Sequence, residues 1–299
     1  AVSLVPILRG EKLMLVGDPQ QLNPVILLDE AANQKLRRRY QIADEYDYRK
    51  NSIYKTYLAC DCVSDEVLLR YHYRCNRKII GFNNRKYYNS RLKICSESQE
   101  AQPLVYVDVK DGKTDCKNMA PAEAEAVIRL ARDCGERTVG VITPFVSQRQ
   151  LIEKRLKEEG LTNVSCGTVH AFQGDEKDVV IFSTALTDRT HASTYEWLKN
   201  NRELINVATS RAREKLIVLA SGENLERLHG EGGEDDLYDL VTYVKSSGAS
   251  QVMPKENHSR ALGVKPFSTA TEEAFLLTLN HALENLWLTQ NRFSEEKEV

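Results

Sequence analysis

Short apolar runs alternate with helical patterns along most of this chain. The runs that predict buried strands cover residues 12–16, 103–109, 138–143, 163–168, 178–185 and 215–220. Helical patterns separate them, as where Pro121 is followed by apolar residues at Val127, Leu130, Ala131 and Cys134. Because parallel strands need such crossover helices, the alternation predicts an α/β fold with a mostly parallel sheet covered by helices on both faces.

The pattern also predicts where domains begin and end. A strand over 12–16 cannot form a sheet alone, so we expect it to belong to a preceding domain. The run from Leu27 to Ala32 fits the start of a helix through Arg39 better than an acidic magnesium motif, because acids begin it and bases end it. The predicted divisions are the end of a first lobe at 1–25, a connector at 26–65, a doubly wound domain at 66–245, a linker at 246–268, and an amphipathic helix at 269–299 that begins a further domain or packs on this one.

Composition narrows the class of protein. The chain has 299 residues, of which 41% are hydrophobic and 28% charged, as in ordinary globular proteins. We find neither a membrane-spanning run nor a signal-peptide pattern. Seven cysteines without zinc-like spacing predict reduced thiols and no metal site, so we expect a cytoplasmic protein, or a nuclear one in a eukaryote.

Charge is informative only locally, because the net charge is -2. The stretch from Val67 to Ser96 contains no Asp or Glu, and its Arg and Lys residues are interleaved with four tyrosines. Basic groups contact phosphates and aromatic rings stack on bases, so this stretch could bind a single strand. A solvated basic face is an equally good interpretation on charge alone.

Two polar loops adjoin predicted strands. Residues 168–178 precede one apolar run, and residues 206–213 precede another. Ligands in open α/β sheets sit at the carboxyl ends of strands, so we expect these loops to form a binding site there.

These loops and three other segments resemble, in sequence order, the motifs of one enzyme family. Gly17 to Leu22 resembles the third motif of superfamily 1 helicases, and Tyr73-Arg74 resembles the fourth, although Cys75-Asn76-Arg77 stands where the family usually has Met-His-Pro. The remaining matches are to the backbone-contacting, fifth and sixth motifs, at 140–145, 168–178 and 206–213. Residues 1 to about 221 therefore resemble the second half of such a helicase, of the group that includes the nonsense-mediated-decay helicase and DNA-directed relatives.

The resemblance implies a RecA-like fold and a role for particular residues. Gln21 would sense the γ-phosphate of ATP, and Arg74 and Arg211 would reach it as arginine fingers. The other nucleotide-binding residues would be Asp18, Tyr73, Gly174 and Glu176, and the nucleic-acid contacts would be Thr143, Pro144, Thr168 and Ser210.

The sequence contains no GxxxxGK[ST] phosphate loop. By the resemblance, that loop and the acidic magnesium motif would belong to an N-terminal RecA-like lobe. We therefore expect ATP and Mg²⁺ to be bound only in a complete protein, whose partner is single-stranded DNA or RNA. This chain would be a monomeric fragment that is inactive alone. The alternative is a catalytically silent nucleic-acid or protein-binding module that keeps the fold.

Overall fold

The computed structural model describes residues 7, 9–12, 14–22, 26–47, 49–59, 67–110, 118–230 and 232–253. The chain divides into two units, 1–254 and 255–299, and all described residues fall in the first. The predicted helix at 269–299 lies outside the described residues.

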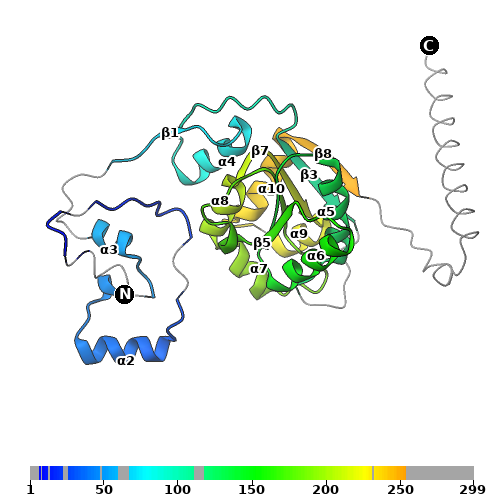
Figure 1. Ribbon diagram of the computed structural model, residues 1–299. Helices are drawn as coiled ribbons and strands as arrows, with labels where there is room; N and C mark the ends of the chain where they lie inside the picture. Colours follow the sequence, from blue (N-terminus) through cyan, green and yellow to red (C-terminus); the bar gives the residue numbers. More distant parts are fainter. Residues whose placement is uncertain are drawn as a thin grey trace, which may run out of the picture. The chain divides into compact units, whose positions relative to one another are not determined.

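A six-stranded sheet forms the centre of the domain (Figure 1). Its strand order is β5-β4-β6-β7-β3-β8, and every neighbouring pair is parallel. The strands are β3 (Leu104–Val109), β4 (Val139–Thr143), β5 (Val164–Thr168), β6 (Lys177–Ser183), β7 (Ala212–Ala220) and β8 (Ala249–Met253). The predicted mostly parallel sheet is thus confirmed, and four of the apolar runs form its inner strands β3, β4, β6 and β7.

Helices cover both faces of this sheet. Along β6, Val179 and Ile181 point into the core beneath α5 (Pro121–Asp133) and α6 (Val146–Glu158). Val180 and Phe182 point into the opposite core. That core is closed by α4 (Arg77–Tyr87), the 3-10 turn η2 (Val169–Phe172), α7 (Ala192–Lys199), α8 (Arg202–Ser210), α9 (Gly222–His229) and α10 (Asp236–Ser247). Between β6 and β7 the chain forms two helices, α7 and α8.

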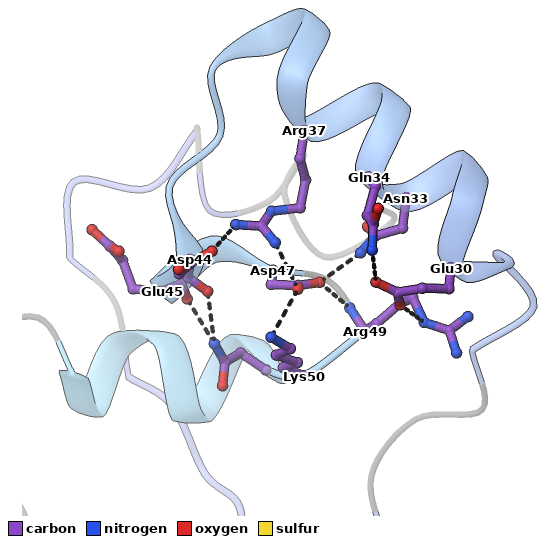
Figure 2. Close-up of polar contacts among 10 residues, drawn as sticks. Glu30, Asn33, Gln34, Arg37, Asp44, Glu45, Asp47, Arg49 and Lys50 are labelled. Carbon is purple, nitrogen blue, oxygen red and sulfur yellow. Dashed lines mark hydrogen bonds and ion pairs between the residues drawn. The ribbon is translucent and has the colours of Figure 1, made fainter.

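A small helical segment precedes the domain in sequence. It contains α2 (Glu30–Tyr40), a 3-10 turn η1 (Asp44–Tyr46) and α3 (Ile53–Ala59), which confirms the predicted helix through Arg39. Figure 2 shows Asp47 at its centre, accepting hydrogen bonds from Asn33 Nδ2 at 2.9 Å and Arg37 Nη1 at 3.0 Å. The Asp47 side chain is 1% exposed, so polar contacts rather than an apolar core hold these turns together.

The strand predicted over 12–16 was wrong for the residues that can be described. Residues 14–18 form no strand, and the side chains of Met14 and Val16 are 88% and 84% exposed. A strand exists only through hydrogen bonds to a neighbour, and no described segment pairs with this one.

The linker predicted to begin at residue 246 was also wrong at its start. Helix α10 continues to Ser247, and β8 then pairs with β3 at the edge of the sheet. An edge strand is paired on one side only, so it tolerates the exposed Ser250 and Gln251 that made the segment resemble a linker.

A buried carboxylate joins α5 to the end of β6. Glu123 is 1% exposed, and its Oε2 accepts hydrogen bonds from Ser183 Oγ at 2.7 Å and from the Ala185 backbone N–H at 2.9 Å. Ala185 has φ of +53°, a strained value for a residue with a Cβ, so this bond holds the chain in an unusual turn. Burial raises the pKa of Glu123 to about 7, because a charge in the core lacks solvation.

We expect Gly248→Ala to destabilise the domain by about 1–3 kcal/mol, the usual range for an added methyl group in a packed site. A Cβ at Gly248 would overlap the backbone oxygen of Leu104, at the point where the chain enters β8. The free energy of unfolding measured in urea tests this, with Ser250→Ala on exposed β8 surface as the control. Equal stability of both variants and the parent would show that β8 does not pack as described.

We expect Glu123→Gln to remove part of the pH dependence of stability. The ordinary pKa of Glu is 4.5, so between about pH 4.5 and 7 the folded parent binds a proton that the unfolded chain has released. Its free energy of unfolding therefore falls as pH rises through this window, and the neutral amide lacks that fall. Urea unfolding of both proteins at pH 5 and at about pH 8 measures this difference. If the free energy of unfolding changed equally between the two pH values in parent and variant, the prediction would be contradicted.

Candidate nucleotide and nucleic-acid sites

Four polar side chains from distant parts of the sequence meet at one place. Arg211 Nη2 donates a hydrogen bond to Gln21 Oε1 at 3.3 Å, and Arg74 Nε lies 2.5 Å from Glu176 Oε2. We call Gln21, Arg74, Glu176 and Arg211 the arginine cluster. The structure thus brings together all three residues predicted to contact the γ-phosphate.

Arg211 is fixed by backbone carbonyls. It follows the last residue of α8, and its Nε donates to the Val207 oxygen at 3.4 Å. Its Nη1 donates to the Asp175 oxygen at 3.3 Å, and the residue is only 3% exposed. Burial lowers the pKa of Arg211, and the positive charge of Arg74 lowers it further. The negative side chains that act on Arg211 are Glu176, which is paired with Arg74, and Asp175.

Arg74 is held beside Arg211 by the residues that follow it. Cys75 Sγ donates to the Ser210 oxygen at 3.3 Å, and the Asn76 backbone N–H donates to the Arg213 oxygen at 2.6 Å. These bonds join the start of α4 to the segment that carries Arg211. His72 adds no charge here at neutral pH, because burial lowers its pKa to about 4.

The segment from Gly17 to Leu22, which we call the Asp18 loop, adjoins the arginine cluster. Asp18 Oδ1 accepts from the Gln20 backbone N–H at 2.9 Å, and Asp18 Oδ2 accepts from Gln21 Nε2 at 2.9 Å. Tyr88 Oη also bonds Asp18, and Asn206 Nδ2 bonds the Gln20 oxygen. Tyr88 is one of the four tyrosines of the basic stretch at 67–96, but no motif connected it with the Asp18 loop.

Gly174 and Tyr73 lie on accessible parts of the site. Gly174 has φ of +89°, which a residue with a Cβ rarely adopts, so its loop needs glycine. Tyr73 is 68% exposed and its ring is stacked on Tyr71, with 6.5 Å between the centroids. Lys93 Nζ lies 5.1 Å from the Tyr71 ring, so this surface combines aromatic and positive groups as the sequence predicted.

The loops lie at the opposite ends of the strands from those expected. Glu176 directly precedes β6, and Arg211 directly precedes β7, so both are at amino ends. The reason is the path of η2 across the face of the sheet, where Phe172 occupies the space left by Gly140 and Gly167. The chain thereby returns from the carboxyl end of β5 to the amino end of β6.

The predicted nucleic-acid residues are divided between two places. Thr143 and Thr168 are register partners at the carboxyl ends of β4 and β5, with the half-buried Pro144 next to them. Thr143 is fully buried, and its Oγ1 lies 3.5 Å from the Phe145 nitrogen. Ser210 lies apart from them on α8, is 7% exposed, and donates to the Val207 oxygen at 3.3 Å. Thr168 and Pro144 are therefore the more accessible members of this set.

The described residues contain no group of three or more His, Cys, Asp or Glu side chains arranged to hold a metal ion. Within the same part of the chain, no helix is long and apolar enough to cross a membrane.

Comparisons with known proteins agree on one family. The model of the AAA domain family matches residues 50–223. An uncharacterised ATP-dependent helicase of Methanocaldococcus jannaschii is 27% identical, over 81% of this chain and 36% of its own length. Helicase sen1 of Schizosaccharomyces pombe is 27% identical over 75% of this chain and 14% of its own length. The DNA replication ATP-dependent helicase/nuclease DNA2 of Bos taurus is 26% identical over 76% and 24%.

The chain thus spans about a third or less of the length of these relatives. Among solved structures, the C-terminal domain of a possible DNA helicase from Lactobacillus plantarum aligns with a TM-score of 0.38 at 19% identity, covering 60% of this chain and 98% of that domain. A TM-score of 0.38 is too low to carry an argument, so the fold assignment rests on the parallel sheet described above. The family match covers more than half of the sequence and includes the arginine-cluster residues Arg74, Glu176 and Arg211. The chain therefore belongs to the AAA domain family and is a RecA-like helicase domain of superfamily 1, in the group that its motifs resemble.

Proposed function

We propose that this chain is the second motor lobe of an ATP-dependent helicase or translocase, and that Arg74 and Arg211 are its arginine fingers. The observation that carries the proposal is the arginine cluster, in which a 3% exposed Arg211 lies beside Arg74 and bonds Gln21. Charge on a phosphoryl group during transfer is stabilised by guanidinium groups held in place beforehand. Arg211, which is fixed by two backbone oxygens, and Arg74, which is paired with Glu176, meet that requirement.

A bound nucleotide would replace two contacts within the arginine cluster. Glu176 now pairs with Arg74, and the Gln21 amide oxygen now accepts from Arg211. A γ-phosphate offers both guanidinium groups a more highly charged acceptor, which would free Glu176 to accept from a ribose hydroxyl. Mg²⁺ and the remaining phosphates would be held by a phosphate loop on a first lobe, since the 299 residues contain no GxxxxGK[ST].

Single-stranded DNA or RNA would bind at the other end of the sheet. Thr168 and Pro144 offer hydroxyl and backbone contacts at the carboxyl ends of β5 and β4, where readout does not depend on base sequence. Relatives are named for both acids, as an RNA helicase and as a DNA replication helicase/nuclease, so the names do not choose between them. Closure of two lobes on ATP would then alternately tighten and release the strand.

The test of this function is ATP hydrolysis with and without single-stranded DNA or RNA. We expect strand-stimulated hydrolysis in the full-length protein and none in the isolated 299-residue chain. Clear stimulated hydrolysis by the isolated chain would refute the division of the ATP site. Absence of ATP hydrolysis in both proteins would favour the alternative, a binding module that keeps the fold without motor activity.

We expect Arg211→Ala in the full-length protein to lower the kcat for ATP by at least about a thousandfold, as for other arginine fingers. Single-strand binding, measured by fluorescence anisotropy, should change little. Arg202→Ala removes a guanidinium from the other end of the same helix, where it is half exposed near Asp236, and should keep kcat near the parent value. A main loss in strand affinity rather than in kcat would place Arg211 on the nucleic-acid side.

A further inference from the structure

We propose that Tyr88 is a positioning residue for ATP hydrolysis, which holds the Asp18 loop in place so that Gln21 is presented beside Arg211. The inference rests on the proposed function, because it concerns the same ATP site. It assigns a role to a residue that lies outside every motif identified in the sequence.

Tyr88 connects the Asp18 loop to helix α8. Its hydroxyl donates to Asp18 Oδ2 at 2.6 Å and accepts from Asn206 Nδ2 at 3.0 Å. Asn206 Nδ2 also donates to the Gln20 backbone oxygen at 2.8 Å. The phenol is thus both a donor and an acceptor between two groups that do not hydrogen-bond each other directly.

These bonds close a ring through the arginine cluster. Gln21 Nε2 donates to the same Asp18 Oδ2 at 2.9 Å, while Gln21 Oε1 accepts from Arg211 Nη2 at 3.3 Å. Asn206 and Arg211 are five residues apart on α8 and its C-terminal cap, so the helix itself completes the ring. We call the set Asp18, Gln21, Tyr88, Asn206 and Arg211 the hydrogen-bonded ring.

Asn83 fixes the orientation of the Asn206 side-chain amide. Asn83 Nδ2 donates to Asn206 Oδ1 at 2.6 Å and to Thr209 Oγ1 at 2.7 Å, and all three residues are at most 1% exposed. With its amide oxygen held by Asn83, Asn206 must present its NH₂ group to Tyr88. Burial raises the pKa of Tyr88, so its hydroxyl keeps its proton at neutral pH and can donate to Asp18.

The ring gives Gln21 one orientation before any nucleotide binds. Asp18 fixes the NH₂ end of its amide, and Arg211 fixes the oxygen end. Without the phenol, Asp18 loses one of its donors and Asn206 loses an acceptor, so the half-exposed loop can move relative to α8. An interaction needed mainly in the transition state affects kcat more than KM.

The experiment is a comparison of Tyr88→Phe and Tyr87→Phe in the full-length protein. Tyr87 is the neighbouring buried tyrosine, and its ring packs on Phe82 with 6.0 Å between centroids. We expect Tyr88→Phe to lower the strand-stimulated kcat about tenfold, as for loss of one hydrogen bond to a charged group, with KM for ATP within about twofold. Tyr87→Phe should leave both constants near the parent values. An unchanged kcat in Tyr88→Phe overturns the inference.

The same substitution in a Gln21→Ala protein distinguishes a positioning role of Tyr88 from a general loss of structure. If Tyr88 acts through Gln21, Tyr88→Phe should cause no further loss of kcat in a Gln21→Ala protein. Equal losses in both backgrounds overturn the inference and indicate a structural role. Asp18→Asn is the second variant, expected to show the same non-additivity should Tyr88→Phe fold poorly in a thermal unfolding control.

The same experiment distinguishes failure of the inference about Tyr88 from failure of the proposed function. A Gln21→Ala protein with a low kcat beside a fully active Tyr88→Phe protein rejects only the role of Tyr88. A Gln21→Ala protein with an unchanged kcat overturns the assignment of Gln21 as the γ-phosphate sensor, and the inference with it.

Discussion

The burial of a permanent cation, Arg211, constrains the rest of this site. A guanidinium cannot lose its proton in a protein, so at 3% exposure it must be hydrogen-bonded or its burial becomes very costly. Its partners are two backbone oxygens, of Val207 and Asp175, and the amide oxygen of Gln21. Each partner comes from a different segment, so satisfying one side chain brings helix α8, the loop before β6 and the Asp18 loop into one place.

The parallel sheet explains why such a cluster can be both buried and precise. Strands β6 and β7 are neighbours with helices over both faces, so the residues just before them start from fixed points. Arg211 and Glu176 lie at those points, at the amino ends, while Thr143 and Thr168 lie at carboxyl ends of β4 and β5. The two proposed sites therefore lie at opposite ends of one sheet, with the nucleotide site at the amino ends of β6 and β7 and the nucleic-acid site at the carboxyl ends of β4 and β5.

Local patterns were sufficient to predict the sheet and the residues around Arg211, because buried parallel strands and motif order are both written in short stretches of sequence. They failed where the outcome depends on a partner. The apolar run at 14–16 has exposed side chains because no described segment pairs with it, and polar Ser250 joins the sheet because an edge strand needs only one neighbour. Glu123 carried no signal, and Tyr88 only that of one tyrosine in a basic stretch. An acid near a helix start and a tyrosine near a helix end are ordinary residues, and their contacts here are 62 and 70 positions away.

The hydrogen-bonded ring links the proposed γ-phosphate sensor, Gln21, to helix α8. Gln21 and Arg211 would meet the same phosphate from loop and helix, and a direct bond of 3.3 Å between them is long and easily exchanged. The shorter bonds of 2.6 Å and 3.0 Å at Tyr88 involve neither Gln21 nor Arg211, so they need not break when the contact between those two residues does. In the proposed cycle the loop would release Arg211 to the phosphate while it stays attached to α8 through Tyr88 and Asn206. Such an attachment would keep Gln21 and Arg211 in register during the exchange, which a direct contact between them alone could not do.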